Sequence, residues 1–267
     1  MRKSVIKAKL RRGEPALVVT LHLQDASLYE MTSLMGFDGI WVDMEHHALG
    51  LESVQHFMRA ARVGRTDILA RPAKGEFMRM GRMLEVGAQG ILYPRCDNAE
   101  EAAEVVRWAK FPPEGCRGID SGNADNPYCA VPLADYLPEA NRETFIAIQI
   151  EDAAALEHAE AIAAVDGVDL LFLGPGDFSA LSGIPGQMNH EIIRDATRRV
   201  AAAAKAAGKT WGRPVGSAEQ AREMLDLGAG FLACGADLLM VKTGLERLQS
   251  DFAPLGFTFD NQFRRPE

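Results

Sequence analysis

Residues 36–43 read Gly-Phe-Asp-Gly-Ile-Trp-Val-Asp, which is a glycine-containing turn followed at once by a short apolar run. The same arrangement returns at 87–93, 167–172 and 228–233. A glycine commonly ends a helix in the left-handed conformation, and an apolar run without alternation is typical of a strand buried on both faces. The repeated pattern therefore predicts parallel strands that are each preceded by a helix.

Extended over the whole chain, this pattern predicts eight strands that alternate with helices. We place the strands near residues 16–23, 39–44, 67–71, 89–94, 144–150, 169–173, 209–215 and 230–234. The helices are expected near 26–35, 52–63, 76–86, 98–109, 152–164, 190–207, 217–227 and 236–249. Eight such units in about 250 residues indicate an α/β fold of the (β/α)₈ TIM-barrel type. A doubly wound open sheet is the alternative, although no GxGxxG turn follows the first strand.

Composition limits the classes of protein that the chain can represent. The 267 residues are 47% hydrophobic and 25% charged, with a net charge of −8, which is typical of a globular protein and excludes a mainly disordered one. The acidic balance argues against nucleic acid as a partner. The four cysteines lack CxxC spacing, and no segment is long and apolar enough to span a membrane, so we expect a cytoplasmic protein. No Pro/Ser-rich linker is present, and residues 1–267 are predicted to form a single domain.

One long stretch, from Phe111 to Val131, shows no clear helix or strand pattern and is rich in proline and glycine. Stretches of this length inside a compact domain are usually functional loops. We expect it to reach over the catalytic face or towards a neighbouring subunit; a purely connective role is the alternative.

Polar residues follow four of the predicted strands, where the chemistry of such a barrel is located. These four strand ends read Asp43-Met44-Glu45-His46-His47, Arg71-Pro72, Gln149-Ile150-Glu151-Asp152 and Gly174-Pro175-Gly176-Asp177. Because all eight strands of a barrel end on the same face, these side chains are predicted to converge on one site.

Glu151 and Asp177 are the candidate metal ligands. Two carboxylates on neighbouring strands, without a nearby pair of cysteines or histidines, suit a hard divalent ion such as Mg²⁺ or Mn²⁺. Each residue also precedes a predicted helix, so an N-cap role is the alternative.

His46 and Arg71 are candidates for acid–base and charge-stabilising roles. A histidine at a strand end, adjacent to acidic residues, is suited to act as a general base. Arg71 can bind a carboxylate in a two-pronged fashion or polarise a carbonyl group, and a structural ion pair at the barrel rim is the alternative.

Taken together, these motifs resemble the 4-hydroxy-2-oxoheptanedioate (2,4-dihydroxyhept-2-ene-1,7-dioate) aldolase family. The resemblance covers most of the chain and rests on Gly36-Phe37-Asp38, Asp43-x-Glu45-His46, Arg71-Pro72, residues 111–118, Gln149-x-Glu151 and Gly174-Pro175-x-Asp177-x-Ser179. Members of that family are class II, metal-dependent pyruvate aldolases with a (β/α)₈ barrel of the phosphoenolpyruvate/pyruvate type. The resemblance implies reversible cleavage of a 4-hydroxy-2-keto acid to pyruvate and an aldehyde, with oxaloacetate decarboxylation as a possible side activity.

The resemblance also implies a role for each matching residue. Glu151 and Asp177 would hold a divalent cation (Mg²⁺, Mn²⁺ or Co²⁺), His46 would be the base, and Arg71 would stabilise the transition state. Gln149, the backbone amide of Gly176 and Asp177 would bind the small-molecule substrate. The family usually forms a homohexamer in which the last helix, here 236–249, is exchanged between subunits.

One position departs from the family pattern. The family pairs its histidine base with an aspartate, and the sequence Met83-Leu84-Glu85 places Glu85 there, one methylene longer. Three alternatives remain: an acyl-CoA carbon–carbon lyase of the same superfamily, a class I aldolase with a Schiff-base lysine, and a non-catalytic keto-acid-binding barrel. The lysines considered for the class I mechanism are Lys74, Lys209 and Lys242.

Overall fold

The computed structural model describes residues 2–263 of the chain. Its strands form one closed, parallel barrel in sequential order, with the last strand hydrogen-bonded back to the first. They are β1 (Ala16–Leu21), β2 (Gly39–Asp43), β3 (Asp67–Arg71), β4 (Gly90–Tyr93), β5 (Phe145–Ile150), β6 (Leu170–Leu173), β7 (Thr210–Val215) and β8 (Phe231–Cys234). The predicted TIM-type barrel is confirmed, and the open-sheet alternative is wrong.

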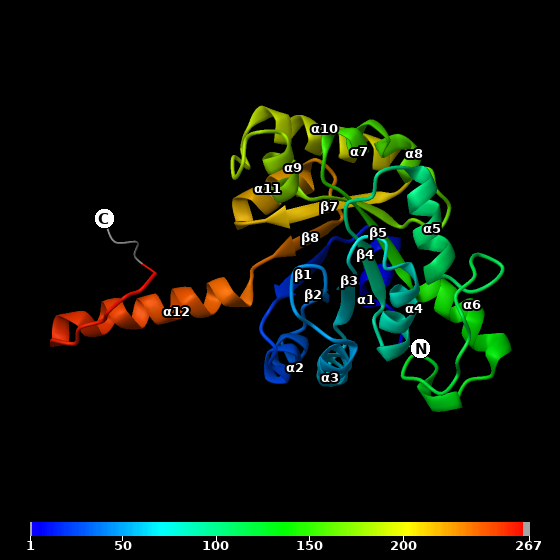
Figure 1. Cartoon of the computed structure of the whole chain (residues 1–267), viewed down its shortest axis with the longest axis horizontal. Helices are drawn as coiled ribbons and strands as arrows, with labels where there is room; N and C mark the ends of the chain where they lie inside the picture. Colours follow the sequence, from blue (N-terminus) through cyan, green and yellow to red (C-terminus); the bar gives the residue numbers. More distant parts are fainter. Residues whose placement is uncertain (1, 264–267) are drawn as a thin grey trace.

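Most helices cover the outer face of this barrel (Figure 1). The α-helices are α1 (Val5–Arg11), α2 (Ala26–Leu34), α3 (Leu51–Ala61), α4 (Phe77–Val86), α5 (Ala99–Ala109), α6 (Leu133–Glu143), α7 (Ala153–Glu157), α8 (Ala159–Ala163), α9 (Pro175–Leu181), α10 (Glu191–Ala206), α11 (Ala218–Asp226) and α12 (Asp237–Phe252). Two short 3₁₀ helices, η1 (Pro127–Cys129) and η2 (Ala253–Leu255), complete the described elements.

The turn glycines that predicted the strands adopt the expected backbone conformation. Gly36, Gly87, Gly167 and Gly228 have φ angles of 83°, 121°, 88° and 88°. These values lie in the left-handed half of conformational space, which side chains with a Cβ rarely adopt. The glycines therefore allow each preceding helix to stop and the chain to turn directly into a buried strand.

Large aromatic side chains fill the interior of the barrel. Phe172 lies edge-on to both Trp41 and Phe231, with ring centroids 5.7 Å apart in each pair. Ile6 of α1 belongs to the same hydrophobic cluster. Helix α1 is held against the barrel because the backbone N–H of Ile6 donates a hydrogen bond to Asp67 Oδ2 across 2.9 Å. The barrel is thus packed at its N-terminal end, and the polar residues gather at the opposite end.

From α6 onwards, the helices differ from the prediction in three places. Helix α6 was not expected, because prolines at positions 132 and 138 interrupt its pattern; it forms because Tyr136 packs against Phe111, with ring centroids 5.4 Å apart. The single helix predicted over 152–164 is divided into α7 and α8, and α9 is an additional short helix. The stretch 111–131 is irregular apart from η1, as predicted, and is pinned by a buried ion pair between Arg117 and Asp125 at 3.3 Å.

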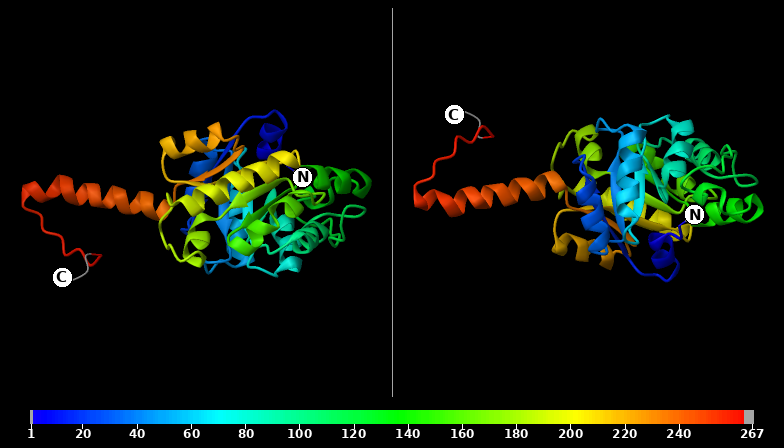
Figure 2. Two further views of the ribbon diagram at one scale, coloured as in Figure 1. Left: turned by 90° about the horizontal axis from the view of Figure 1, so that it is seen from above. Right: turned by 90° about the horizontal axis from the view of Figure 1, so that it is seen from below.

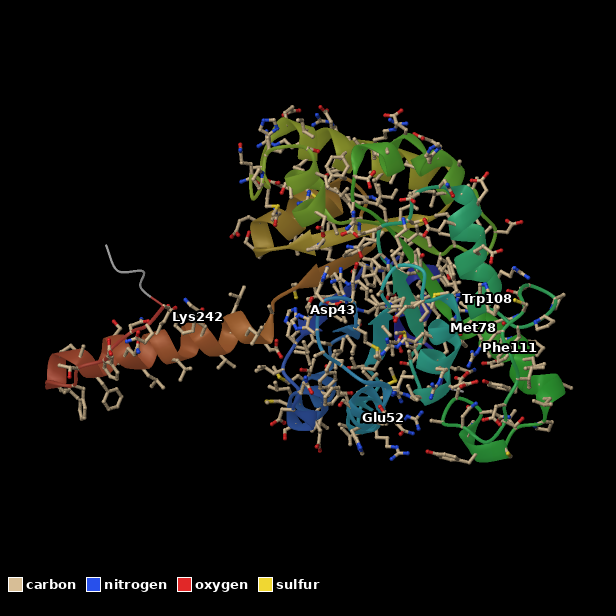
Figure 3. The ribbon with its side chains drawn as sticks, viewed as in Figure 1. Asp43, Glu52, Met78, Trp108, Phe111 and Lys242 are labelled. Atoms are coloured by element: carbon tan, nitrogen blue, oxygen red, sulfur yellow. The ribbon has the colours of Figure 1, made fainter. Side chains whose placement is uncertain are left out.

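Helix α12 projects away from the barrel instead of returning to cover it (Figures 1 and 2). Asp237 at its start is its one buried residue. Figure 3 shows the separation between Asp43, at the end of β2, and Lys242 on this helix. None of the helices within residues 2–263 is both long enough and apolar enough to cross a membrane.

Candidate active site

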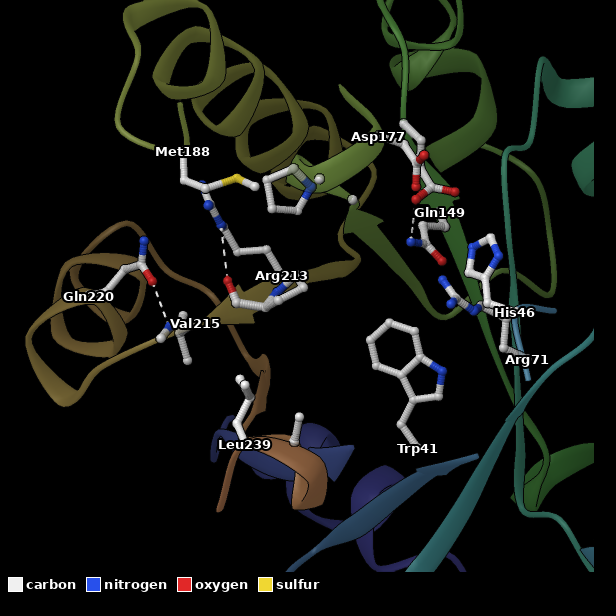
Figure 4. Close-up of a pocket in the computed structure, with 18 of the residues that line it drawn as sticks. Trp41, His46, Arg71, Gln149, Asp177, Met188, Arg213, Val215, Gln220 and Leu239 are labelled. Atoms are coloured by element: carbon white, nitrogen blue, oxygen red, sulfur yellow. Dashed lines mark hydrogen bonds between the residues drawn. The ribbon is translucent and has the colours of Figure 1, made fainter. Parts of the chain in front are cut away.

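Six of the seven predicted site residues line one cavity of about 960 Å³ at the C-terminal end of the barrel (Figure 4). They are His46, Arg71, Gln149, Glu151, Gly176 and Asp177. Parallel strands bring them together, because β2, β3, β5 and β6 all end on the same face. Convergence of these strand ends was the central sequence prediction about the site, and it is confirmed.

Glu151 is held in place by hydrogen bonds to both carboxylate oxygens. Gln149 Nε2 donates to Glu151 Oε1 across 2.6 Å, and the backbone N–H of Arg95 donates to Oε2 across 3.0 Å. Burial, together with the negative charge of Asp177, raises the pKa of Glu151 to about 7. Glu151 is therefore a buried carboxylate at the lining of the cavity, and the negative charge of Asp177 disfavours its ionised form.

The donor set fits a hard divalent cation. Glu151 and Asp177 provide carboxylate oxygens, and the buried Oε1 of Gln149 has no hydrogen-bond partner within the described part of the chain. A positive ion would relieve the repulsion that raises the pKa of Glu151. Within residues 2–263, no group of three or more His, Cys, Asp or Glu side chains is arranged so that it could hold a metal ion by itself. Two protein carboxylates leave open positions, as is usual for Mg²⁺ sites that also bind substrate.

The N-cap alternative for these two residues is wrong. Asp152, one residue after Glu151, caps α7 by accepting a hydrogen bond from the backbone N–H of Ala155 across 2.7 Å. Gly174 occupies the cap position of α9, and Asp177 lies within the first turn of that helix. Neither Glu151 nor Asp177 is needed to cap a helix.

Arg71 is buried and oriented by two carboxylates. Its Nε donates to Asp43 Oδ1 across 3.0 Å and its Nη2 donates to Asp43 Oδ2 across 2.6 Å, while Glu45 Oε2 lies 3.2 Å from Nε. Burial alone would raise the pKa of Asp43, but the Arg71 hydrogen bond and charge lower it below its ordinary value. The guanidinium also lies over the ring of Trp41, 4.7 Å from its centroid. Arg71 is thus a rigid cation beside the carboxylate pair.

His46 is the exposed member of the group. Its side chain is 56% exposed, and its Nε2 lies 3.5 Å from Glu45 Oε2. The backbone N–H of His46 donates to Asp43 Oδ1 across 3.3 Å, so the aspartate that orients Arg71 also fixes the loop that carries His46. This position allows a proton transfer between the imidazole and a bound molecule.

Glu85 is the predicted site residue that does not line the cavity. It is half-buried on α4, where burial raises its pKa above the ordinary value, although the nearby charge of Arg117, in the 111–131 stretch, opposes this shift. Within one chain, the carboxylate that the structure places beside His46 belongs to Glu45. The expected pairing of Glu85 with His46 is therefore not formed in the single chain.

Three functional features were not identified from the sequence. Trp41 forms the cavity wall beneath Arg71, and Glu45 contacts both Arg71 and His46. At Gly174, a Cβ atom would lie 2.2 Å from Glu151 Oε1 and 2.8 Å from Gln149 Nε2. In the sequence, the feature that could have identified Gly174 is its position directly after a buried strand. The absence of a side chain there allows the carboxylate of Glu151 to lie close to the backbone.

The class I alternative has no lysine in the right place. Within the described residues, none lines the cavity. Lys74 pairs with Asp97 at 2.7 Å, Lys209 donates to the carbonyl of Val168, and Lys242 pairs with Glu246 on α12, so none of these three faces the carboxylate pair.

Comparison with known proteins places the chain among lyases. A family model described as HpcH/HpaI aldolase/citrate lyase matches residues 17–243. The chain is 34% identical over 245 residues to 2-keto-3-deoxy-L-rhamnonate aldolase of Klebsiella pneumoniae subsp. pneumoniae, covering 90% of each chain. It is 32% identical over 251 residues to 4-hydroxy-2-oxo-heptane-1,7-dioate aldolase of Salmonella arizonae, covering 94% of this chain and 95% of the relative.

Similarity to solved structures agrees with this assignment. The crystal structure of an HpcH/HpaI aldolase from Desulfitobacterium hafniense superposes with a TM-score of 0.85 at 30% identity, covering 91% of this chain and 96% of the other. The family match begins at the second residue of β1 and includes every strand end that lines the cavity. The chain therefore belongs to the HpcH/HpaI aldolase/citrate lyase family and is an enzyme of the lyase kind.

Proposed function

We propose that the protein is a divalent-metal-dependent aldolase that reversibly cleaves a 4-hydroxy-2-keto acid to pyruvate and an aldehyde. The observation that carries this proposal is the pair Glu151 and Asp177 beside the cation of Arg71, in a cavity whose described lining has no lysine. The aldolase names of two relatives, at 34% and 32% identity, support the same reaction class.

Glu151 and Asp177 would hold Mg²⁺, Mn²⁺ or Co²⁺, with Gln149 as a neighbour that keeps Glu151 oriented. When bound, the ion supplies a Lewis acid that polarises the keto oxygen of the substrate. The N–H groups of Gly176 and Asp177 lie in the first turn of α9, where they have no partner within the helix, and would receive the substrate carboxylate.

Arg71 would stabilise the negative charge that develops on the keto oxygen during cleavage. Breaking the C3–C4 bond leaves its electron pair on the pyruvate half, as an enolate. The guanidinium is already oriented by Asp43, so little reorganisation is needed when this charge appears. Gln149 would contact the substrate from the neighbouring strand.

His46 would accept the proton of the C4 hydroxyl as the C3–C4 bond breaks and the aldehyde carbonyl forms. Its exposed imidazole reaches into the cavity, and Glu45 lies close enough to stabilise the protonated ring. Decarboxylation of oxaloacetate also produces a pyruvate enolate but needs no hydroxyl proton removed, so it is a natural side reaction for this site.

The proposed activity can be tested with a pyruvate-release assay over a panel of 4-hydroxy-2-keto acids. We expect cleavage by the wild-type enzyme and its loss in Glu151→Gln, which keeps the side-chain volume but removes the charge. Asp152→Asn, one residue away, changes only a helix cap and is the matched control. If Glu151→Gln cleaves every substrate as fast as Asp152→Asn, the proposal is wrong.

We also propose that α12 docks on another copy of the chain and that the protein is a homo-oligomer, with a homohexamer expected from the family resemblance. Away from its buried start, α12 exposes apolar side chains, including Leu239 (63%), Leu245 (57%) and Leu248 (54%). An isolated helix with such a surface requires a partner. Sedimentation velocity should show a smaller species for Leu245→Glu than for Arg247→Glu, which changes an exposed charge on the same helix.

A further inference from the structure

A second cavity of about 490 Å³ lies between β7, α10 and α11. Arg213, Met188 and Gln220 line both this cavity and the larger one that holds Glu151 and Asp177. In Figure 4 these three side chains lie on the side of the larger cavity opposite Asp177, Gln149 and Arg71. They therefore form the boundary between the two cavities, away from the proposed metal ligands.

Arg213 is a buried cation that forms no ion pair, although the charge of Glu223, which lines the second cavity, acts on it from a distance. It is 4% exposed, and in the described part of the chain its side-chain hydrogen bonds go to a hydroxyl and a carbonyl group and none goes to a carboxylate. Two of its nitrogens are occupied: Nη1 donates to Thr197 Oγ1 across 2.9 Å and Nε donates to the carbonyl of Pro214 across 3.3 Å. Its Nη2 has no hydrogen-bond acceptor among residues 2–263, and the residue lines both cavities.

This arrangement differs from that of the other cations nearby. Arg71 has both of its prongs on Asp43. Arg198, on the rim of the second cavity, is exposed and pairs with Glu191 and Asp195. Arg213 alone among these three is buried and forms no ion pair. Burying a charge without an ion-pair partner destabilises a fold, so a guanidinium of this kind at the lining of a cavity is suited to bind an anion.

Gln220 provides a second donor at the same boundary. Its Oε1 accepts a hydrogen bond from the backbone N–H of Gly216 across 2.7 Å, which fixes the amide group and leaves Nε2 to donate. One guanidinium N–H and one amide N–H are a suitable donor set for the two oxygens of a carboxylate or other oxyanion.

We propose that Arg213 and Gln220 form an oxyanion-binding site at the end of the substrate cavity remote from Glu151 and Asp177. Two kinds of molecule could supply an oxyanion that these two donors would bind in the same way. One is a terminal carboxylate on the aldehyde half of the substrate, a role that rests on the proposed function. The other is a free small anion, such as inorganic phosphate or a short carboxylate, and this binding is independent of catalysis.

Binding is tested first, on chelator-treated full-length enzyme so that the proposed metal site does not contribute. Calorimetry with inorganic phosphate and with propionate, at constant ionic strength, should detect binding that Arg213→Met weakens about 10–100-fold, the effect expected for one charge-assisted hydrogen bond. Arg198→Met, which removes an exposed arginine from the same cavity, should bind as the wild type does. Arg213→Lys should retain part of the affinity, because the charge is kept and the fork is lost.

Thermal unfolding shows whether Arg213→Met remains folded. Without anion, this variant should unfold at the same or a higher temperature than the wild type, since an unpaired buried charge has been removed. Added phosphate should raise the unfolding temperature of the wild type and of Arg198→Met by more than that of Arg213→Met.

Kinetics then identifies the source of the oxyanion. If it is the substrate, Arg213→Met should raise KM by about 10–100-fold for a 4-hydroxy-2-keto acid with a terminal carboxylate, with kcat unchanged, and should leave an uncharged analogue of equal length unaffected. Calorimetric binding that depends on Arg213, without this kinetic difference, assigns the site to a free anion. Absence of cleavage by any variant refutes the proposed function but not the site. The site is refuted if Arg213→Met equals Arg198→Met in both anion binding and substrate preference.

Discussion

Asp43 accepts two hydrogen bonds from Arg71, from Nε across 3.0 Å and from Nη2 across 2.6 Å. The two residues are direct neighbours at the ends of β2 and β3, where Asp43 is paired with Arg71 in the parallel register. The pairing of β2 with β3 therefore places the two side chains side by side, and their two hydrogen bonds hold the guanidinium at the edge of the substrate cavity.

From this pair we expect that Asp43 acts on the reaction through Arg71. Arg71→Ala should lower kcat by about 10²–10³-fold, as does loss of one electrostatic donor in other enzymes. Asp43→Asn should lower kcat by about tenfold, and the double variant should be no slower than Arg71→Ala alone, since both changes affect one interaction. Asp38→Asn, one residue before the start of the same strand, is the control. Additive losses in the double variant would show that Asp43 has a role separate from Arg71.

Gly174→Ala tests the close approach between the backbone and Glu151. The new Cβ would lie 2.2 Å from Glu151 Oε1, so the carboxylate must move. We expect the affinity for Mn²⁺ to fall by at least about tenfold while the circular dichroism spectrum is unchanged. Gly176→Ala, where no atom lies within 4 Å of the added Cβ, should retain the affinity of the wild type. Equal affinities in the two variants would contradict the assignment of Glu151 as a metal ligand.

The fold and most of the site were predictable because their signals are local. Each turn glycine preceded an apolar run, and the polar residues that end these runs had to meet once the barrel closed. His46, Arg71, Gln149, Glu151 and Asp177 were found in this way.

The features that escaped prediction depend on contacts between distant segments. Every residue of β2 is buried, so the sequence does not reveal that the Trp41 side chain points into the barrel. The surroundings of Glu85 are set by the irregular 111–131 stretch, which has no periodicity to read. The sequence predicted a helix at 236–249 correctly, but whether that helix returns to the barrel is decided by tertiary contacts.

His46→Ala should separate two reactions of the same site. Cleavage of a 4-hydroxy-2-keto acid needs a base for the hydroxyl proton, whereas decarboxylation of oxaloacetate does not. We expect His46→Ala to lose cleavage and keep both decarboxylation and metal affinity, while Asp177→Ala loses both reactions. His47→Ala, at the adjacent position, is the control for the loop. Simultaneous loss of both reactions in His46→Ala would mean that His46 is a ligand or a structural residue.

The raised pKa of Glu151 predicts how the stability of metal-free enzyme depends on pH. With a pKa of about 7 in the folded state against an ordinary value of 4.5, the native protein binds the extra proton between these two values. The contribution of Glu151 to stability is therefore lost as the pH rises through this range. Urea unfolding with chelator should show wild type losing stability relative to Glu151→Gln between pH 5 and pH 8, and added Mn²⁺ should reverse the loss at pH 8. A difference that is constant with pH would mean that Glu151 titrates normally.

The most direct test of the account is pyruvate release by the full-length enzyme before metal removal, after exhaustive chelation and after Mn²⁺ is restored. If Glu151 and Asp177 hold the ion that the reaction requires, chelation should abolish release, Mn²⁺ should restore it, and borohydride with pyruvate should leave the restored enzyme active. Full activity after chelation, together with inactivation by borohydride in the presence of pyruvate, would contradict the account and indicate a Schiff-base lysine.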